Sequence, residues 1–384
     1  MGQTEIEQLC RGLGERDASL VRRAVSVLTG NRLEGAAELF GGRTMLSPAV
    51  SFFQGVWNWD SAFHAMALAF YDPALAADQI EGFLSYMKED GMLPDCVKTN
   101  GRVGWHSSKP PVFAYATMEV YRRTGNRALL ENTYDRLVRN AEFWQKNRRD
   151  GRLFFYSSYQ KGTPAEERKW AQWESGLDDS PRWDNGIVNL YPVDLNGYML
   201  LTYRSLAEMA ERLGRDGRRW ADEAEVLAEE IEATFWDEAQ GAYVDRDRFT
   251  GAFSTCLTPA SFLPLFVGTA SAERAKKMAD LAADPKKFNA TMPTVAFDDP
   301  SFSDGYWRGP LWMNVAYFAA KGLKRYGFPV ADAIRENILN LVDSIPEAIY
   351  ENYDLIRRAG THAKDFSWSA CFLLEFILNW RETP

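Results

Sequence analysis

Five polar-aromatic segments interrupt a sequence of helical patterns, and they hold the residues that could do chemistry. The segments are 55–64, 105–111, 170–184, 306–312 and 350–368. Eight of the 13 tryptophans fall in them (Trp57, Trp59, Trp105, Trp170, Trp173, Trp183, Trp307 and Trp312), with Trp368 at the edge as a ninth. Flat apolar rings beside a few polar groups suit a sugar, which offers C–H faces and hydroxyls. Alternatively, the rings wedge loops between helices, which leaves the neighbouring carboxylates unexplained.

The same segments carry the acidic residues that hydrolysis of a glycosidic bond requires. They are Asp60, Glu174, Asp178, Asp179, Asp184, Glu351 and Asp354. Hydrolysis needs two carboxyl groups in different environments, one a protonated acid and the other an ionised base or nucleophile. Taken singly, each has a plainer explanation as a helix cap or a solvated charge. Asp60, for example, directly precedes Ser61, where a helix could begin.

Composition and charge exclude several other classes of function. The 384 residues carry 44 basic and 53 acidic side chains, and the formal charge of −9 argues against a nucleic-acid partner. No long apolar stretch predicts a membrane span, and the N-terminus lacks the pattern of a secretory signal. Three histidines without HxxxH and four scattered cysteines without CxxC predict no metal site and a reducing cytoplasm. We expect no cofactor, and the sequence gives no oligomeric state.

Helical periodicity dominates the chain between these segments. Apolar residues step by three or four positions from Leu195 to Leu213, and the spacing recurs at 130–144 and 220–235. Three helical patterns with basic last turns end at the glycines Gly125, Gly214 and Gly327. About ten to twelve helices in successive hairpins are expected, which fits an open stack or a closed toroid.

Two local features accompany this pattern. Asp194 stands where the N-cap of the helix from Leu195 is expected. A minor hairpin is predicted between residues 243–245 and 252–254, with Thr250-Gly251 at its turn. No linker rich in Pro, Gly or Ser divides the chain, so the pattern favours one domain.

Five motifs occur together and in order along the chain. They are Trp57-Asn-Trp-Asp60 with Ala62-Phe63, Glu174-Ser-Gly-Leu-Asp178, Pro192-Val-Asp-Leu-Asn196, Tyr306-Trp-Arg-Gly-Pro310 and Tyr350-Glu-Asn-Tyr353. Through them, residues 45–380 resemble glycoside hydrolase family 63, which includes processing α-glucosidase I and bacterial mannosylglycerate hydrolases. The chain is similar, more distantly, to the family 37 trehalases. The resemblance implies an all-α (α/α)6 barrel with minor β-hairpins in the loops, formed by residues 1–384 as one catalytic domain.

The resemblance also implies hydrolysis with inversion at the anomeric carbon. Asp178 matches the family's general acid and Glu351 its general base, and adjacent Asp179 is the main rival for the acid. Inversion predicts that the two carboxyls lie roughly 6.5–9.5 Å apart. Desolvation by rings such as Trp173 or Trp183 would raise the pKa of Asp178 so that it can donate a proton.

A wider set of side chains is expected to bind the substrate, a small carbohydrate. The set is Trp57, Trp59, Asp60, Phe63, Lys109, Trp173, Arg182, Tyr306, Trp307, Arg308, Trp312, Tyr353 and His362. Family members often carry glutamine where this chain has Lys109. A lysine facing the pocket would favour an anionic group on the substrate, as would Arg182 and Arg308, although Lys109 could equally be a solvated loop residue. His362 could touch substrate or serve the structure.

The sequence therefore predicts an inverting α-glycosidase acting on a small α-glucoside or α-mannoside, which could carry an acidic group. Three alternatives stay open. The chain could be a trehalase-like disaccharide hydrolase, a sugar-binding toroid without catalysis, or an epimerase that uses histidines on the same barrel. The trehalase alternative is weakened because the chain looks short for that family.

Overall fold

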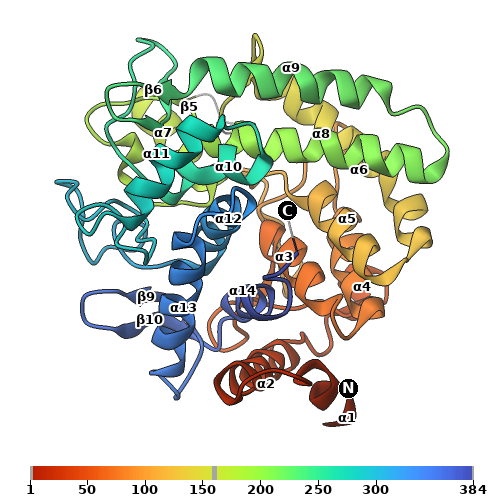
Figure 1. Ribbon diagram of the computed structural model, residues 1–384. Coiled ribbons are helices and arrows are strands. Elements are labelled where there is room, and N and C mark those ends of the chain that lie inside the picture. The colour runs from red at the N-terminus through yellow and green to blue at the C-terminus, as the bar shows by residue number, and fades with distance from the viewer. Residues whose placement is uncertain (1–2, 158–161, 383–384) are drawn as a thin grey trace.

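Helices account for most of the regular structure in the computed structural model, which describes residues 3–157 and 162–382 (Figure 1). The α-helices are α1 (Gln3–Leu9), α2 (Glu15–Gly30), α3 (Asn58–Leu68), α4 (Pro73–Leu84), α5 (Phe113–Thr124), α6 (Arg127–Asn147), α7 (Pro164–Ser175), α8 (Val193–Leu213), α9 (Arg218–Thr234), α10 (Leu263–Val267), α11 (Ala272–Ala283), α12 (Met313–Arg325), α13 (Val330–Asp343) and α14 (Ser367–Leu378). Short 3-10 helices are η1 (Ala37–Phe40), η2 (Pro181–Trp183) and η3 (Pro259–Phe262).

The strands are short and lie in the loops. They are β1 (Gly55–Trp57), β2 (Cys96–Lys98), β3 (Arg149–Asp150), β4 (Leu153–Phe154), β5 (Leu190–Tyr191), β6 (Trp236–Asp237), β7 (Ala242–Tyr243), β8 (Arg246–Asp247), β9 (Tyr350–Asp354) and β10 (Ala359–Lys364). Each belongs to a two-stranded antiparallel sheet, in the pairs β1–β2, β3–β4, β5–β8, β6–β7 and β9–β10. None of these sheets is large enough to form a core.

The helices of the described ranges form a closed double ring. The inner helices α3, α5, α8, α10, α12 and α14 contact one another in this order, and α14 contacts α3, which closes the ring. The outer helices α2, α4, α6, α9, α11 and α13 surround them, and α2, α6 and α9 lie at the periphery in Figure 1. This arrangement is an (α/α)6 barrel, so the predicted fold class with minor β-hairpins is confirmed.

Burial distinguishes the inner helices from the outer ones. Every residue of α3 is buried, because this helix has neighbours on all sides. In α9, by contrast, the buried residues are Trp220, Ala224, Leu227 and Ile231, which are spaced by four, three and four positions. An apolar stripe of this kind suits a helix with one face on the core and one in solvent.

The glycine stops are confirmed, whereas the predicted N-cap is wrong. Gly125 and Gly214 end α5 and α8 in the left-handed conformation, with φ of 69° and 70°, and Gly327 follows α12 with φ of 77°. Helix α8 begins at Val193, so Asp194 lies inside its first turn. Its carboxylate binds a buried arginine instead of capping the helix.

The predicted hairpin is confirmed only in part. Asp247 and Ser254 donate backbone hydrogen bonds to Ala252 and Asp245, at 2.9 and 2.8 Å, so the two segments do run antiparallel. Tyr243, however, pairs with Trp236 in the sheet β6–β7. The expected strand is therefore divided between two partners.

Loop strands fix the entrances to two inner helices. Strand β1 ends at Trp57, and α3 begins at the next residue. Near the C-terminus, Leu311 exchanges two backbone hydrogen bonds with Tyr353, of 2.8 and 3.0 Å, which ties the loop before α12 to β9.

Within the described ranges, no helix combines the length and the apolar character that crossing a bilayer requires.

Arg182 is the centre of a buried ion-pair network beside the ring. Its guanidinium donates to both carboxylate oxygens of Asp194, at 2.7 and 3.0 Å, and to both of Asp245, at 2.6 and 2.8 Å. The arginine side chain is fully buried. The network joins η2, the start of α8 and the loop after β7.

We expect Arg182→Met to lower the free energy of unfolding by roughly 3–5 kcal/mol, because two buried carboxylates would lose their partner. Denaturant unfolding at neutral pH measures this loss. The control is Arg127→Met, which breaks the exposed pair of Arg127 and Glu131 and should leave the midpoint almost unchanged. An Arg182→Met protein as stable as wild type would contradict a structural role for the network.

Candidate active site

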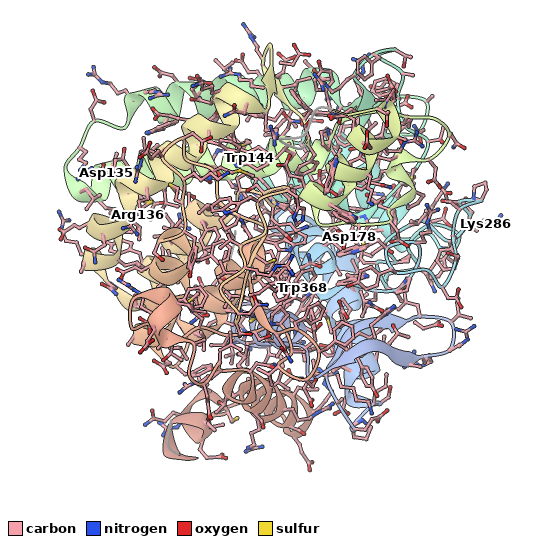
Figure 2. The ribbon with its side chains drawn as sticks, turned by 180° about the vertical axis from the view of Figure 1, so that it is seen from behind. Asp135, Arg136, Trp144, Asp178, Lys286 and Trp368 are labelled. Carbon is pink, nitrogen blue, oxygen red and sulfur yellow. The ribbon has the colours of Figure 1, made fainter. Side chains whose placement is uncertain are left out.

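A cavity of about 230 Å³ lies at the N-terminal ends of the inner helices α3, α5, α12 and α14. Its lining residues are Pro48, Phe53, Trp57, Trp59, Asp60, Asp95, His106, Lys109, Trp173, Gly176, Asp178, Tyr306, Trp307, Trp312, Glu351, Phe366 and Trp368. Figure 2 shows Asp178 and Trp368 near the centre of the molecule, with Asp135, Arg136 and Lys286 at its rim. The cavity is smaller than the roughly 300–1,000 Å³ typical of ligand pockets, which favours a small ligand.

Tryptophan rings form much of the cavity wall. Trp307 and Trp312 stack with their ring centroids 3.8 Å apart and their planes within 10°. Trp59 meets Trp368 edge to face, at a centroid distance of 5.1 Å. Because each ring is held by another, the wall is a preformed apolar surface.

A close approach at Gly176 sets the loop that carries Asp178. Gly176 ends α7 with φ of 76°, which favours glycine, and a Cβ atom there would lie 2.3 Å from the Trp59 ring. The loop thus rests directly on a tryptophan of the cavity wall. This contact accounts for the glycine of the Glu174-Ser-Gly-Leu-Asp178 motif.

Glu174 anchors the same loop from below. Its carboxylate is fully buried and accepts two hydrogen bonds from Arg148, at 2.8 and 3.0 Å. It also accepts backbone N–H groups of Ser108 and Ser157, at 3.2 and 2.6 Å. Glu174 therefore joins α7 to the end of α6 and to the loop that carries Lys109.

Asp178 and Asp179 have different surroundings. Asp178 lines the cavity, and its side chain keeps 45% of its surface exposed toward the open site. Protein atoms still enclose it closely enough that desolvation raises its pKa to about 6, against the opposing charge of Lys109. Asp179 instead accepts the backbone N–H of Trp307 at 2.6 Å and is not part of the lining. This contact makes Asp179 a tie between two loops.

Glu351 faces the same cavity from β9. Tyr306 donates its hydroxyl to one carboxylate oxygen, and the backbone N–H of Ala363 donates to the other at 3.2 Å. The pairing of β9 with β10 is irregular between Thr361 and Lys364, where His362 has a φ of 62°, which leaves the Ala363 N–H free for Glu351. Desolvation raises the pKa of Glu351, although these hydrogen bonds favour its ionised form.

Lys109 is buried, so its interpretation as a solvated loop residue is wrong. Its ammonium donates to the backbone carbonyl of Trp173 and lies 3.3 Å from Asp95 and 3.9 Å from Asp178. Burial lowers the pKa of Lys109, but the charges of Asp95 and Asp178 outweigh this effect and raise it overall. His106 contacts the second oxygen of Asp95, with its Nε2 atom at 3.4 Å.

Asp60 lies in the first turn of α3, at the cavity surface. Its residue is 4% exposed, and desolvation raises the pKa of its carboxyl to about 8, partly offset by Lys109. At neutral pH the carboxyl is therefore mainly protonated and can both donate and accept a hydrogen bond. Such a group suits sugar hydroxyls.

The cavity brings together most of the residues expected from sequence. Those in the lining are Trp57, Trp59, Asp60, Lys109, Trp173, Asp178, Tyr306, Trp307, Trp312 and Glu351. Sequence reasoning missed Asp95, and it left His106 without a role. His106 follows Trp105 in one of the polar-aromatic segments, which marks it, whereas Asp95 lies in Leu-Pro-Asp-Cys and has no aromatic neighbour in sequence.

Five expected binding residues lie outside the lining, each for a physical reason. Phe63 packs in the core against Phe372, and the guanidinium of Arg182 is already paired with Asp194 and Asp245 in its buried network. Arg308 forms a bidentate pair with Asp184, with both distances 2.8 Å.

The other two belong to the strand region near Glu351. The Tyr353 hydroxyl is buried and accepts the backbone N–H of Tyr350 at 3.0 Å. His362 lies 3.1 Å from the Asn352 side chain and packs on Tyr306. In the described part of the chain, no group of three or more His, Cys, Asp or Glu residues is arranged to hold a metal ion.

Known proteins share both this sequence pattern and this fold. Residues 54–369 match the mannosylglycerate hydrolase MGH1-like glycoside hydrolase domain, which is most of the chain. The chain therefore belongs to this family of glycoside hydrolases, and the resemblance to family 63 is confirmed. Over 424 aligned residues it is 26% identical to the mannosylglycerate hydrolase of Rubrobacter radiotolerans, with 86% of this chain and 92% of that protein covered.

Solved structures agree with this assignment. The family 63 mannosylglycerate hydrolase of Thermus thermophilus, in complex with glucose, matches with a TM-score of 0.80 and 25% identity, over 94% of this chain and 100% of that one. The neutral trehalase of Saccharomyces cerevisiae shares the fold, with a TM-score of 0.73 and 17% identity over 89% of this chain and 74% of its own. The predicted enzyme class is thus confirmed, while the role of each catalytic residue stays a prediction.

We expect Asp60→Asn to stabilise the protein at neutral pH. The folded state keeps this carboxyl protonated up to a pKa of about 8, whereas the unfolded chain ionises it near 4. Folding must then take up a proton, so the stability that Asp60 provides below about pH 4 is lost as the pH rises toward about 8.

Urea unfolding at about pH 5 and about pH 7.5 tests this expectation. The free energy of unfolding of Asp60→Asn should exceed that of wild type by more at the higher pH, because asparagine takes up no proton on folding. The exposed Asp135 gives a control, since Asp135→Asn should show no such trend. An equal or smaller advantage at the higher pH would contradict a protonated Asp60.

Proposed function

We propose that the chain is an inverting α-glycosidase that hydrolyses a small α-mannoside or α-glucoside with an acidic leaving group. Asp178 acts as the general acid and Glu351 as the general base. One observation carries the proposal, namely that these two carboxyls, 173 positions apart, line the same small cavity between tryptophan rings. Family membership supports hydrolysis of an O-glycosidic bond.

The acid step follows from the surroundings of Asp178. With a pKa raised to about 6 by desolvation, a useful fraction of the carboxyl is protonated near neutral pH. Its proton passes to the glycosidic oxygen as the bond from that oxygen to the anomeric carbon breaks. The leaving group departs as a neutral alcohol at this position, and Asp178 is left ionised.

The base step uses the two hydrogen bonds that Glu351 accepts. Tyr306 and the Ala363 N–H orient the carboxylate and favour its ionised form against the desolvation that raises its pKa. A water between Glu351 and the sugar gives its proton to the carboxylate while its oxygen bonds to the anomeric carbon from the face opposite the leaving group. This geometry inverts the anomeric configuration, and it requires the two carboxyls roughly 6.5–9.5 Å apart.

Two groups of side chains position the sugar in this scheme. Asp60 and His106 offer polar atoms at the cavity surface, and the tryptophans offer flat faces to the C–H groups of the ring.

A second cavity, of about 750 Å³, shares His106 with the first and is lined by Lys98 and Arg102 but by no carboxylate. Lys98 lies over the Trp57 ring, 3.7 Å from its centroid, at the border of the two cavities.

This second cavity supports an acidic leaving group. Two of the relatives named above are mannosylglycerate hydrolases, whose named substrate carries a carboxylate. Lys109 already faces two carboxylates, so it is a poor partner for a further anion. No carboxylate is among the residues that line the cavity of Lys98 and Arg102, so these two cations give the carboxylate of the leaving group a place to bind.

We also propose cytoplasmic action, because all four cysteines are free thiols.

We expect Asp178→Asn and Glu351→Gln each to reduce kcat on mannosylglycerate by about 10²–10⁴-fold or more, with the fold retained. The two roles separate on α-mannosyl fluoride, whose leaving group needs no proton. Asp178→Asn should retain much of the wild-type rate on the fluoride, whereas Glu351→Gln should remain slow. Time-resolved ¹H NMR of the wild-type reaction should show the β-anomer of the sugar first.

Asp179→Asn serves as the matched control for the acid. It should keep turnover well above that of Asp178→Asn, because Asp179 binds a backbone N–H outside the lining. Initial release of the α-anomer would refute inversion. Loss of fluoride hydrolysis in Asp178→Asn, with survival in Glu351→Gln, would refute the assignment of acid and base.

A substrate panel tests the acidic leaving group. We expect Lys98→Met to raise KM for mannosylglycerate and glucosylglycerate severalfold, with little change for methyl α-mannoside, and the effect should shrink at high salt. Methionine keeps the apolar stem on Trp57 while it removes the charge. The control is Lys276→Met on the remote helix α11, which should change neither KM. Equal effects on charged and neutral substrates would contradict the proposal, and faster hydrolysis of trehalose would favour the trehalase-like alternative.

A further inference from the structure

Lys109 occupies a position that sequence alone does not explain. Its residue is 8% exposed, and its ammonium is fixed by the Trp173 carbonyl, which it reaches with a hydrogen bond. From this point it lies 3.3 Å from one oxygen of Asp95 and 3.9 Å from one oxygen of Asp178. A buried ammonium so close to the candidate acid must influence whether that acid holds its proton.

Several charged or titratable groups face this pair from the surrounding elements. They are Asp60 on α3, Asp95 before β2, His106 on the loop before α5, Asp179 beside Asp178, Tyr306 before α12 and Glu351 on β9. Asp95 lies closer to the Lys109 ammonium than Asp178 does, at 3.3 Å against 3.9 Å. The interaction of Lys109 with Asp178 is therefore balanced mainly by Asp95.

We propose that Lys109 is a positioning residue of the general acid, and that the pair of Lys109 and Asp95 sets the pH range in which Asp178 donates its proton. The inference rests on the proposed function, because it requires Asp178 to be the acid. Lys109 stabilises the ionised form of Asp178, while Asp95 stabilises the protonated form. Removing either charge alone must shift the balance, and the two shifts must have opposite signs.

The alternative role for Lys109 is to bind an anionic group of the substrate. The ammonium already faces two carboxylates and a carbonyl oxygen, which leaves little net positive charge for a further anion. Asp95 is itself placed by the fold, since its backbone N–H donates to the Gly104 carbonyl at 2.8 Å, and His106 Nε2 lies 3.4 Å from its other carboxylate oxygen. These contacts favour control of the acid over recognition of the substrate.

The test is the pH dependence of kcat/KM for Lys109→Gln, Asp95→Asn and the double variant. Asp178 must be protonated to act, so activity falls as the pH rises through its pKa, which desolvation raises to about 6 in the wild type. An opposite charge at this range lowers the pKa of a carboxyl by about one unit or more. Lys109→Gln should therefore move the alkaline limb upward by about one pH unit, and Asp95→Asn should move it downward.

The double variant removes both charges together. Its alkaline limb should lie between those of the single variants, near the wild-type position. Lys169→Gln is the matched control. Lys169 is exposed, and its ammonium lies over the ring of Trp173, 4.7 Å from the ring centroid. Its limb should stay at the wild-type pH.

A merely structural role for Lys109 would lower activity at every pH without moving the limb, and that result would overturn the proposal. Shifts of both single variants in the same direction would overturn it too. If Lys109→Gln fails to fold, Asp95→Asn still tests the predicted downward shift. Asp178→Asn separates this inference from the function on which it rests. If that variant keeps the wild-type alkaline limb, the acid has been misassigned. If the limb disappears in Asp178→Asn yet stays fixed in the Lys109 and Asp95 variants, only the role of Lys109 is refuted.

Discussion

Closure of the helical ring is the constraint on which the rest of the structure depends. Asp178 follows α7 and Glu351 lies on β9, so no local structure can bring them together. Contact of α14 with α3 joins the two ends of the inner ring and puts the loops of distant hairpins around one cavity. Short hydrogen bonds then bind the loops to one another, such as that from the Trp307 N–H to Asp179.

The electrostatics of the cavity follow from crowding acidic groups into a small apolar space. Burial raises the pKa of Asp60, Asp178 and Glu351, whereas Lys109 and His106 outweigh burial at Asp95 and lower its pKa. One enclosure thus holds carboxyls of quite different acidity. That difference is what separates an acid from a base in the same site, and it is maintained at a cost in folding stability that the ring of buried helices must offset.

Features of the fold and of the site could be predicted from sequence where the residues that reveal them are close together along the chain. Helical periodicity and glycine stops are local, so the helix hairpins and the ends at Gly125 and Gly214 could be predicted. Loops rich in tryptophan around carboxylates pointed to the cavity in the same way. Arg182 shows the limit, because its partner Asp245 lies 63 positions away and only the fold reveals that its charge is already neutralised. Asp95 could not be predicted as a site residue, because no neighbouring residue in sequence indicates that it contacts Lys109.

The contact between Gly176 and Trp59 has a consequence for how this site can diverge. Even a methyl group at position 176 would collide with the indole, which also forms part of the cavity wall. A larger residue at the glycine is therefore compatible only with a smaller or displaced ring at the tryptophan. The two positions should covary among homologous sequences, and new substrate preferences should arise more readily in hairpins that do not include this pair.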